Sequence, residues 1–120
     1  TGVYTFDEHI ERKSEEIRGL AATLREYLLA LDSAIEEVPR KNYVAYRLTQ
    51  NIVCMEIQTQ CILLFVKLNP KELGALPENA RDVSQIGHYG TGDLELSIKT
   101  KADIAEAKSL IEKSYKKVGG

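Results

Sequence analysis

Apolar residues recur at intervals of three and four in two stretches of the chain, and this spacing predicts two amphipathic helices. The first stretch begins after Ser14 and contains Ile17, Leu20, Ala21, Leu24, Tyr27, Leu28 and Leu31. The second follows Thr100, a capping residue, and runs from Lys101 to about Lys117. A shorter helix is predicted between Tyr4 and Lys13, because Thr5 and Glu8 have the spacing of a capping box.

Between these helices the apolar pattern changes to that of β-strands. Ile52–Ile57 and Cys61–Leu68 are dense apolar runs separated by three polar residues, which predicts a hairpin. The second run is apolar at nearly every position, as expected of a central strand buried on both faces. Leu94–Lys99 alternates apolar and polar residues, so one face of that strand should meet the core. Two weaker strands are predicted at Tyr43–Arg47 and, at the sheet edge before Pro39, at Ile35–Val38.

These elements predict an α+β fold. Two N-terminal helices and one C-terminal helix should pack on an antiparallel sheet of about four to five strands. The segment from Gly74 to Ile86 is interpreted as a loop or a short helix. A chain of 120 residues has the size of one domain, and residues 1–120 are treated as a single unit. The glycines beside both ends, in Thr1-Gly2 and Gly119-Gly120, suggest a domain excised from a longer protein.

The net charge of −2 gives the molecule no overall basic field for nucleic acid or anionic lipid. The charge is uneven, since residues 1–37 carry nine acids and four bases, while the rest carries nine acids and twelve bases. Six lysines gather near the end of the chain, and they are interpreted as a solvated helix face. They are Lys99, Lys101, Lys108, Lys113, Lys116 and Lys117.

Cysteine usage and hydropathy indicate a cytoplasmic protein that is not embedded in a membrane. Cys54 and Cys61 each lie in an apolar run and form no CxxC pair, which is typical of reduced thiols inside the cell. The longest apolar run is far shorter than the roughly 20 residues of a membrane helix. The histidines, cysteines and acids show no metal-ligand spacing, so neither a metal nor another cofactor is predicted.

The segment Arg81–Asp93 contains the residues that are the best candidates for ligand binding. They are Arg81, Asp82, Gly87, His88, Tyr89, Gly90, Gly92 and Asp93. Glycines let a ligand approach backbone amides, arginine can clamp a phosphate or carboxylate, and tyrosine offers a stacking face. The alternative is a structural turn in which Arg81 pairs with Asp82. The glycines precede a strand, whereas dinucleotide and P-loop motifs open a helix.

A second group, Arg40, Lys41, Tyr43 and Arg47, places an aromatic ring among bases, as in proteins that bind single-stranded nucleic acid. Tyr43 and Tyr46 are three residues apart on a strand and should face opposite sides, so at least one belongs to the core. No catalytic triad is indicated, because Ser84 and His88 have no evident third member.

Three segments together resemble a prokaryotic family of uncharacterised domains, sometimes catalogued as predicted transport proteins. They are Val38–Tyr46, the apolar hairpin, and the loop containing Arg81–Ser84 and Gly87–Asp93. The resemblance spans about Tyr4 to Val118. It implies a module that stands alone or ends longer proteins, some with nuclease-like regions, and it implies no established activity. The run Cys61–Val66 is more apolar than the corresponding strand of the family, which is usually basic.

Three hypotheses follow, in order of preference. The chain is a non-catalytic binding or accessory module linked to nucleic-acid-processing proteins, with nucleic acid or a larger protein as its partner. Alternatively, it is a small-molecule or nucleotide-binding enzyme with His88 as acid–base and Arg81 as anion clamp. The third hypothesis is a protein-interaction domain that uses a sheet edge or the long helix, including as a homodimer.

Overall fold

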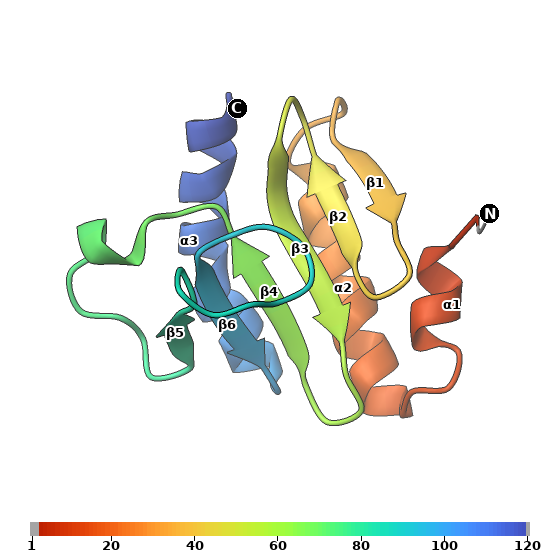
Figure 1. Cartoon of the computed structure of the whole chain (residues 1–120). Coiled ribbons are helices and arrows are strands. Elements are labelled where there is room, and N and C mark those ends of the chain that lie inside the picture. Colours follow the sequence, from red (N-terminus) through yellow and green to blue (C-terminus); the bar gives the residue numbers. More distant parts are fainter. Residues whose placement is uncertain (1–2, 120) are drawn as a thin grey trace.

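The computed structural model describes residues 3–119, which form three α-helices, one 3-10 turn and six strands (Figure 1). In chain order they are α1 (Phe6–Ile10), α2 (Glu15–Ala30), β1 (Glu36–Pro39), β2 (Val44–Arg47), β3 (Asn51–Ile57), β4 (Ile62–Val66), η1 (Pro70–Glu72), β5 (Ala80–Asp82), β6 (Leu94–Ile98) and α3 (Lys101–Val118). Thr1, Gly2 and Gly120, which suggested an excised domain, lie outside the described residues.

The six strands form one antiparallel sheet in the order β1-β2-β3-β4-β6-β5. The α+β class and the central β3–β4 hairpin are confirmed. The prediction of four to five strands is wrong, because the sheet has six and β5 was not predicted. That strand lies in the segment predicted as loop or short helix, and it pairs with β6 through Arg81 opposite Glu95. Arg81 and Asp82 are therefore strand residues and precede the loop proper.

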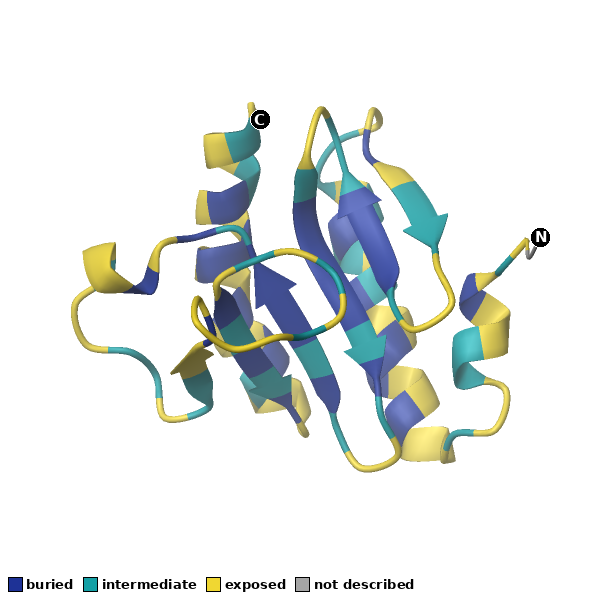
Figure 2. Ribbon diagram, viewed as in Figure 1, coloured by how far each residue is buried: buried dark blue, intermediate teal, exposed yellow. Residues whose placement is uncertain are grey.

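Helices α2 and α3 cover one face of the sheet, and the main core lies between these layers (Figures 1 and 2). The capping residues predicted from the sequence are observed, with Ser14 at the start of α2 and Thr100 at the start of α3. Thr5 and Glu8 form the predicted capping box of α1, which packs on α2. There the guanidinium of Arg25 lies 5.1 Å from the centroid of the Phe6 ring.

The polar side chain of Ser114 is fully buried in the core. Ser114 of α3 donates a hydrogen bond from Oγ to the carbonyl of Ile52 at 2.8 Å and accepts one from the amide of Lys67 at 3.2 Å. It therefore links the last turns of α3 to the start of β3 and to the residue that follows β4. Because both bonds are made to buried or half-buried backbone, they fix the position of the end of β4 along the axis of α3.

The opposite face of the sheet carries one residue from each strand in a continuous row. Cross-strand pairing places Val38, Ala45, Cys54, Phe65, Glu95 and Arg81 side by side. The row is apolar from β1 to β4 and becomes an ion pair at β6 and β5. Its apolar part forms a second, smaller cluster with Val83, covered by the glycine loop, residues 83–93, which crosses in front of the sheet in Figure 1.

Candidate functional site

The glycine loop lies directly on the sheet. The ring of His88 stacks on Phe65 with 4.1 Å between centroids and 2° between planes. Gly90 has φ +79°, and a Cβ on it would come within 2.7 Å of the Cβ of Cys54. Gly92 has φ +132°, and a Cβ there would lie 2.8 Å from the carbonyl carbon of Phe65. These two glycines therefore have a structural task, which is to let the loop backbone touch β3 and β4.

Thr91, between these glycines, is bonded to β3. Its hydroxyl accepts a hydrogen bond from the side-chain amide of Asn51 at 3.1 Å, and its backbone amide donates to the sulfur of Cys54 at 3.4 Å. Burial raises the pKa of the Cys54 thiol, and the hydrogen bonds from Thr91 and Asn51 oppose that rise only in part. Cys54 therefore keeps its proton and serves as an anchor for the loop. It lacks the exposed thiolate that a reactive cysteine needs.

The two charged residues before the loop are engaged with near neighbours. Arg81 donates to the carboxylate of Glu95 at 3.0 Å, so the ion pair forms with Glu95 and the sequence-based alternative of an Arg81–Asp82 pair is wrong. Asp82 accepts hydrogen bonds from the hydroxyl and the amide of Ser84 at 2.6 and 2.9 Å. These bonds, with a smaller contribution from the charge of Lys71, hold the pKa of Asp82 below its ordinary value.

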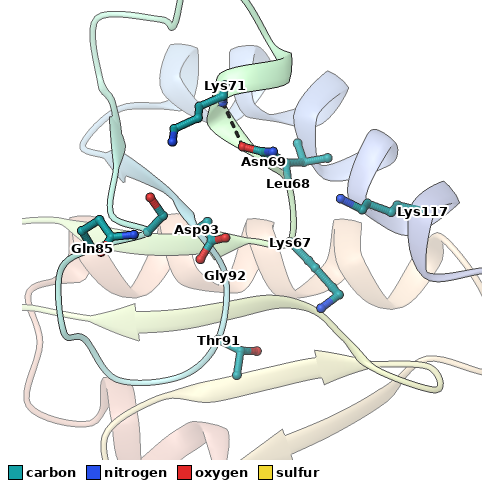
Figure 3. A pocket seen from close by; sticks show the side chains of 10 residues that line it. Lys67, Leu68, Asn69, Lys71, Gln85, Thr91, Gly92, Asp93 and Lys117 are labelled. Atoms are coloured by element: carbon teal, nitrogen blue, oxygen red, sulfur yellow. Dashed lines mark hydrogen bonds between the residues drawn. The ribbon is translucent and has the colours of Figure 1, made fainter.

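A cavity of about 550 Å³ opens beside this loop, where the end of β4, η1 and the end of α3 meet (Figure 3). We call it the lysine cleft, because three of the residues that line it are lysines. Its lining residues are Lys67, Leu68, Asn69, Lys71, Ser84, Gln85, Thr91, Gly92, Asp93 and Lys117. The cleft is thus shared between both ends of the glycine loop and three other segments.

Each lysine of the cleft comes from a different element. Lys67 follows β4, where Ser114 fixes its backbone amide, Lys71 lies in η1, and Lys117 is in the last turn of α3. Figure 3 shows the Lys71 side chain extending from η1 toward Gln85 and Asp93 on the loop side, whereas Lys117 enters the view from α3. Asp93 is the one carboxylate among these lining residues, so the described lining carries a net positive charge of two. Such a site attracts anions, above all those with several oxygens.

The predicted loop residues divide between three places. Gly92 and Asp93 line the lysine cleft, whereas Arg81 lines a separate cavity of about 620 Å³ that also contains Glu78, Lys99, Asp103 and Glu106. His88 rests half-buried on Phe65, and Tyr89 is exposed. The eight residues therefore share a segment of sequence but do not form one binding site.

The second predicted group is spread along the first hairpin. Arg40 and Lys41 lie in the β1–β2 turn, whereas Arg47 is at the other end of β2. The carbonyl of Arg40 is 2.7 Å from Nε2 of His9, which ties this turn to α1. Tyr43 packs half-buried in the smaller cluster and Tyr46 is fully buried in the main core, as expected from their spacing. The four residues do not form one continuous basic surface.

Sequence reasoning missed Lys67 and Lys71, and it treated Lys117 as part of a solvated helix face. A local signal was present for the first two. Lys67 directly follows the most apolar strand, and Lys71 follows Asn69 and Pro70, a cap residue and a proline of the kind that begins a helical turn. A lysine at the end of a buried strand lies at the rim of the sheet, where cavities between connecting segments form.

Residues 3–119 contain neither a cluster of metal-binding side chains nor a helix suited to crossing a membrane. Within this range no group of three or more histidine, cysteine or acidic side chains could hold a metal ion. Over the same residues, none of the helices combines the length and the apolar character that a membrane crossing requires.

Comparison with known proteins gives a family and a relative. A family model described as "Domain of unknown function (DUF5655)" matches residues 6–117. A curated protein of Haemophilus influenzae, named "Uncharacterized protein", is 32% identical over 114 residues, which cover 95% of this chain. The chain spans 38% of the length of that relative. No solved structure matches the chain. The predicted resemblance to an uncharacterised family is thereby confirmed at that general level.

Proposed function

This chain belongs to that family of domains of unknown function, and from that premise we propose that it is a non-catalytic module that binds the phosphate groups of nucleic acid. The observation that carries the proposal is the lysine cleft, in which three lysines from separate segments of the chain line one cavity. Lysine is a compact point charge with three donors, which suits contacts to phosphate oxygens that do not depend on base sequence.

The distribution of charge supports this proposal although the net charge is −2. The acidic first turn of α2 lies at the lower end of the molecule in Figure 1, whereas the end of α3, which contributes Lys117 to the cleft, lies at its upper end. A local positive site acts on a nearby phosphate, whereas exposed charges farther away than about 8 Å are largely screened at physiological salt. The chain would serve as an accessory part of a longer, cytoplasmic nucleic-acid-processing protein, in keeping with the greater length of its relative.

The enzyme hypothesis has less support. A general acid–base must reach the substrate, yet His88 stacks on Phe65 and is absent from the lining of the lysine cleft. The residues that line the cleft include neither histidine nor cysteine. The protein-interaction hypothesis uses either a sheet edge or the long helix. Of the two edge strands, β1 and β5, the second has only three residues. A short, charged edge strand is a poor template for pairing with another chain.

The proposal predicts salt-dependent binding of labelled oligonucleotides, measured by fluorescence anisotropy at low and at physiological salt. Lys71→Ala and Lys117→Ala should each weaken binding several-fold at low salt, and each should reduce the slope of log affinity against log salt by about one. The loss should be uniform across base sequences, because phosphate contacts do not read bases.

Two variants make this experiment specific. Lys116→Ala removes the same charge from the neighbouring position of α3, outside the lining of the cleft, and should change the affinity much less than Lys117→Ala. Lys41→Ala tests the group in the β1–β2 turn and should also have little effect. Equal losses of affinity in Lys116→Ala and Lys117→Ala would mean that a diffuse positive field, and not the cleft, binds the oligonucleotide. An absence of binding at low salt would refute nucleic acid as the partner.

A further inference from the structure

The tip of the glycine loop carries two of the three large hydrophobic side chains that are exposed among the described residues. Ile86 is 47% exposed and Tyr89 is 55% exposed. A tyrosine ring usually buries much of its area, so an aromatic ring held in water on a glycine-rich loop calls for an explanation. Tyr89 is also the only exposed aromatic side chain in this group of three.

The exposure of Tyr89 follows from how its neighbours are fixed. His88 stacks on the ring of Phe65, and the Nδ1 atom of His88 lies 3.0 Å from the carbonyl oxygen of Tyr89. On the other side, Gly90 lies against Cys54 and Tyr43. Both flanking residues are thus packed on the sheet, so the backbone at Tyr89 is positioned and its ring is directed outward. A fixed ring loses less conformational entropy on binding than a mobile one.

Tyr89 is also close to the lysine cleft along the chain. Thr91 lines the cleft and is two residues away, so the two Cα atoms are separated by at most about 7.6 Å. A strand with a phosphate beside Thr91 would therefore have a neighbouring nucleotide close to the backbone of Tyr89. A basic groove next to an aromatic ring is the combination by which proteins hold single strands without reading their sequence.

We propose that the ligand of this site is single-stranded nucleic acid, with its phosphates in the lysine cleft and one base stacked on Tyr89. This inference rests on the proposed function and narrows it. A duplex keeps its bases stacked on one another and offers no free face to the ring, so single strands should bind more tightly than duplexes of equal charge. Tyr43, the aromatic residue first singled out from the sequence, is half-buried against Gly90 and is not the stacking residue.

The test compares two labelled strands of equal length and charge, about 12 units long, by fluorescence anisotropy at low salt. One is poly-thymidine and the other is an abasic sugar–phosphate strand. The protein should bind the thymidine strand at least about five-fold more tightly, because stacking one base on an aromatic ring supplies that much affinity. Tyr89→Ala should abolish this difference without changing affinity for the abasic strand. Tyr89→Phe should retain the difference, and Ile86→Ala, a control on the same loop, should not alter it.

The outcomes separate this inference from the proposed function. Equal affinity for both strands, still weakened by Lys117→Ala, would overturn the stacking role and leave the phosphate-binding module intact. An equal loss of affinity for both strands in Tyr89→Ala would also overturn stacking, because it would mean that Tyr89 only supports the loop. Failure to bind either strand would refute both proposals.

Discussion

Replacing Gly92 with alanine should lower the free energy of unfolding by about 3 kcal/mol. Two costs add at this position. The backbone has φ +132°, which side-chain-bearing residues rarely adopt, and the new Cβ would lie 2.8 to 3.0 Å from backbone atoms of Phe65 and Val66. Main-chain atoms of a central strand cannot move aside as a flexible side chain can, so the loop must lift from β4. Urea denaturation followed by circular dichroism measures the loss.

Substitutions at two other glycines distinguish the cost of backbone strain from the cost of the steric clash. Gly74 has φ +71°, but no atom lies within 4 Å of a Cβ added there. Gly74→Ala should therefore lower the free energy of unfolding only through backbone strain, by about 1 kcal/mol. Gly87 lies in the same loop as Gly92, has no positive φ and has nothing within 4 Å of an added Cβ. Gly87→Ala should therefore leave stability unchanged or raise it slightly. If Gly92→Ala were as mild as Gly74→Ala, the close packing of the loop on β4 would be wrong.

Replacing Tyr46 with phenylalanine should cost about 2 kcal/mol at neutral pH, because the bond it removes ends on a charged group. The fully buried Tyr46 donates from its hydroxyl to the carboxylate of Glu37 at 2.8 Å. The same carboxylate accepts two bonds from Arg25, at 2.6 and 3.1 Å, so β1, β2 and α2 are joined in one network. The variant leaves the Arg25–Glu37 pair in place, and thermal or urea unfolding isolates the contribution of the phenol.

Tyr46 also predicts how stability changes at alkaline pH. Burial, followed by the hydrogen bond to Glu37, raises the pKa of Tyr46 far above its ordinary value. Above about pH 10 the unfolded chain loses this proton while the native protein keeps it, so stability falls as pH rises, by up to about 1.4 kcal/mol per pH unit. Below pH 10 both states are protonated and the full stability is present. Tyr46→Phe should make the alkaline fall less steep.

Tyr27 provides the comparison for this experiment. Burial and a hydrogen bond to Glu112 raise the pKa of Tyr27 to about 12, so it contributes to the alkaline fall in the same direction. Its hydroxyl is near the surface, however, where water can replace Glu112. Tyr27→Phe should therefore cost less than Tyr46→Phe at neutral pH. Equal costs would show that the Glu37 network is not the more strongly stabilising of the two.

The features predicted correctly from the sequence are those specified by residues close together in the chain. Ser14 and Thr100 cap helices whose apolar spacing is local, and the β3–β4 hairpin is marked by two apolar runs around a polar turn. Strand β5 was missed because Ala80–Asp82 has no apolar run, and its strand conformation depends on pairing with β6, fourteen residues away at Arg81–Glu95. A three-residue edge strand is specified by its partner and not by its own composition.

The candidate site was predicted less well than the fold, for a related reason. The glycine loop was singled out from its residue types, but its conformation is decided by what it packs against, Phe65 and Cys54, which are distant in sequence. The lysine cleft combines side chains from the residues after β4, from η1 and from α3, and no local motif connects them. Gly92 and Asp93 appear in both the predicted set and the cleft because the loop returns to the sheet beside it.

The strand order has a consequence for the covalent integrity of the protein. Strand β6 lies between β4 and β5, although β4 and β5 both precede the glycine loop in the chain and β6 follows it. A single cut within the exposed tip of the loop would give two fragments, and the second would consist mainly of β6 and α3. That fragment would remain held by backbone hydrogen bonds on both sides of β6 and by α3 on the core. The two fragments would therefore stay associated through non-covalent contacts after a single cleavage of the backbone.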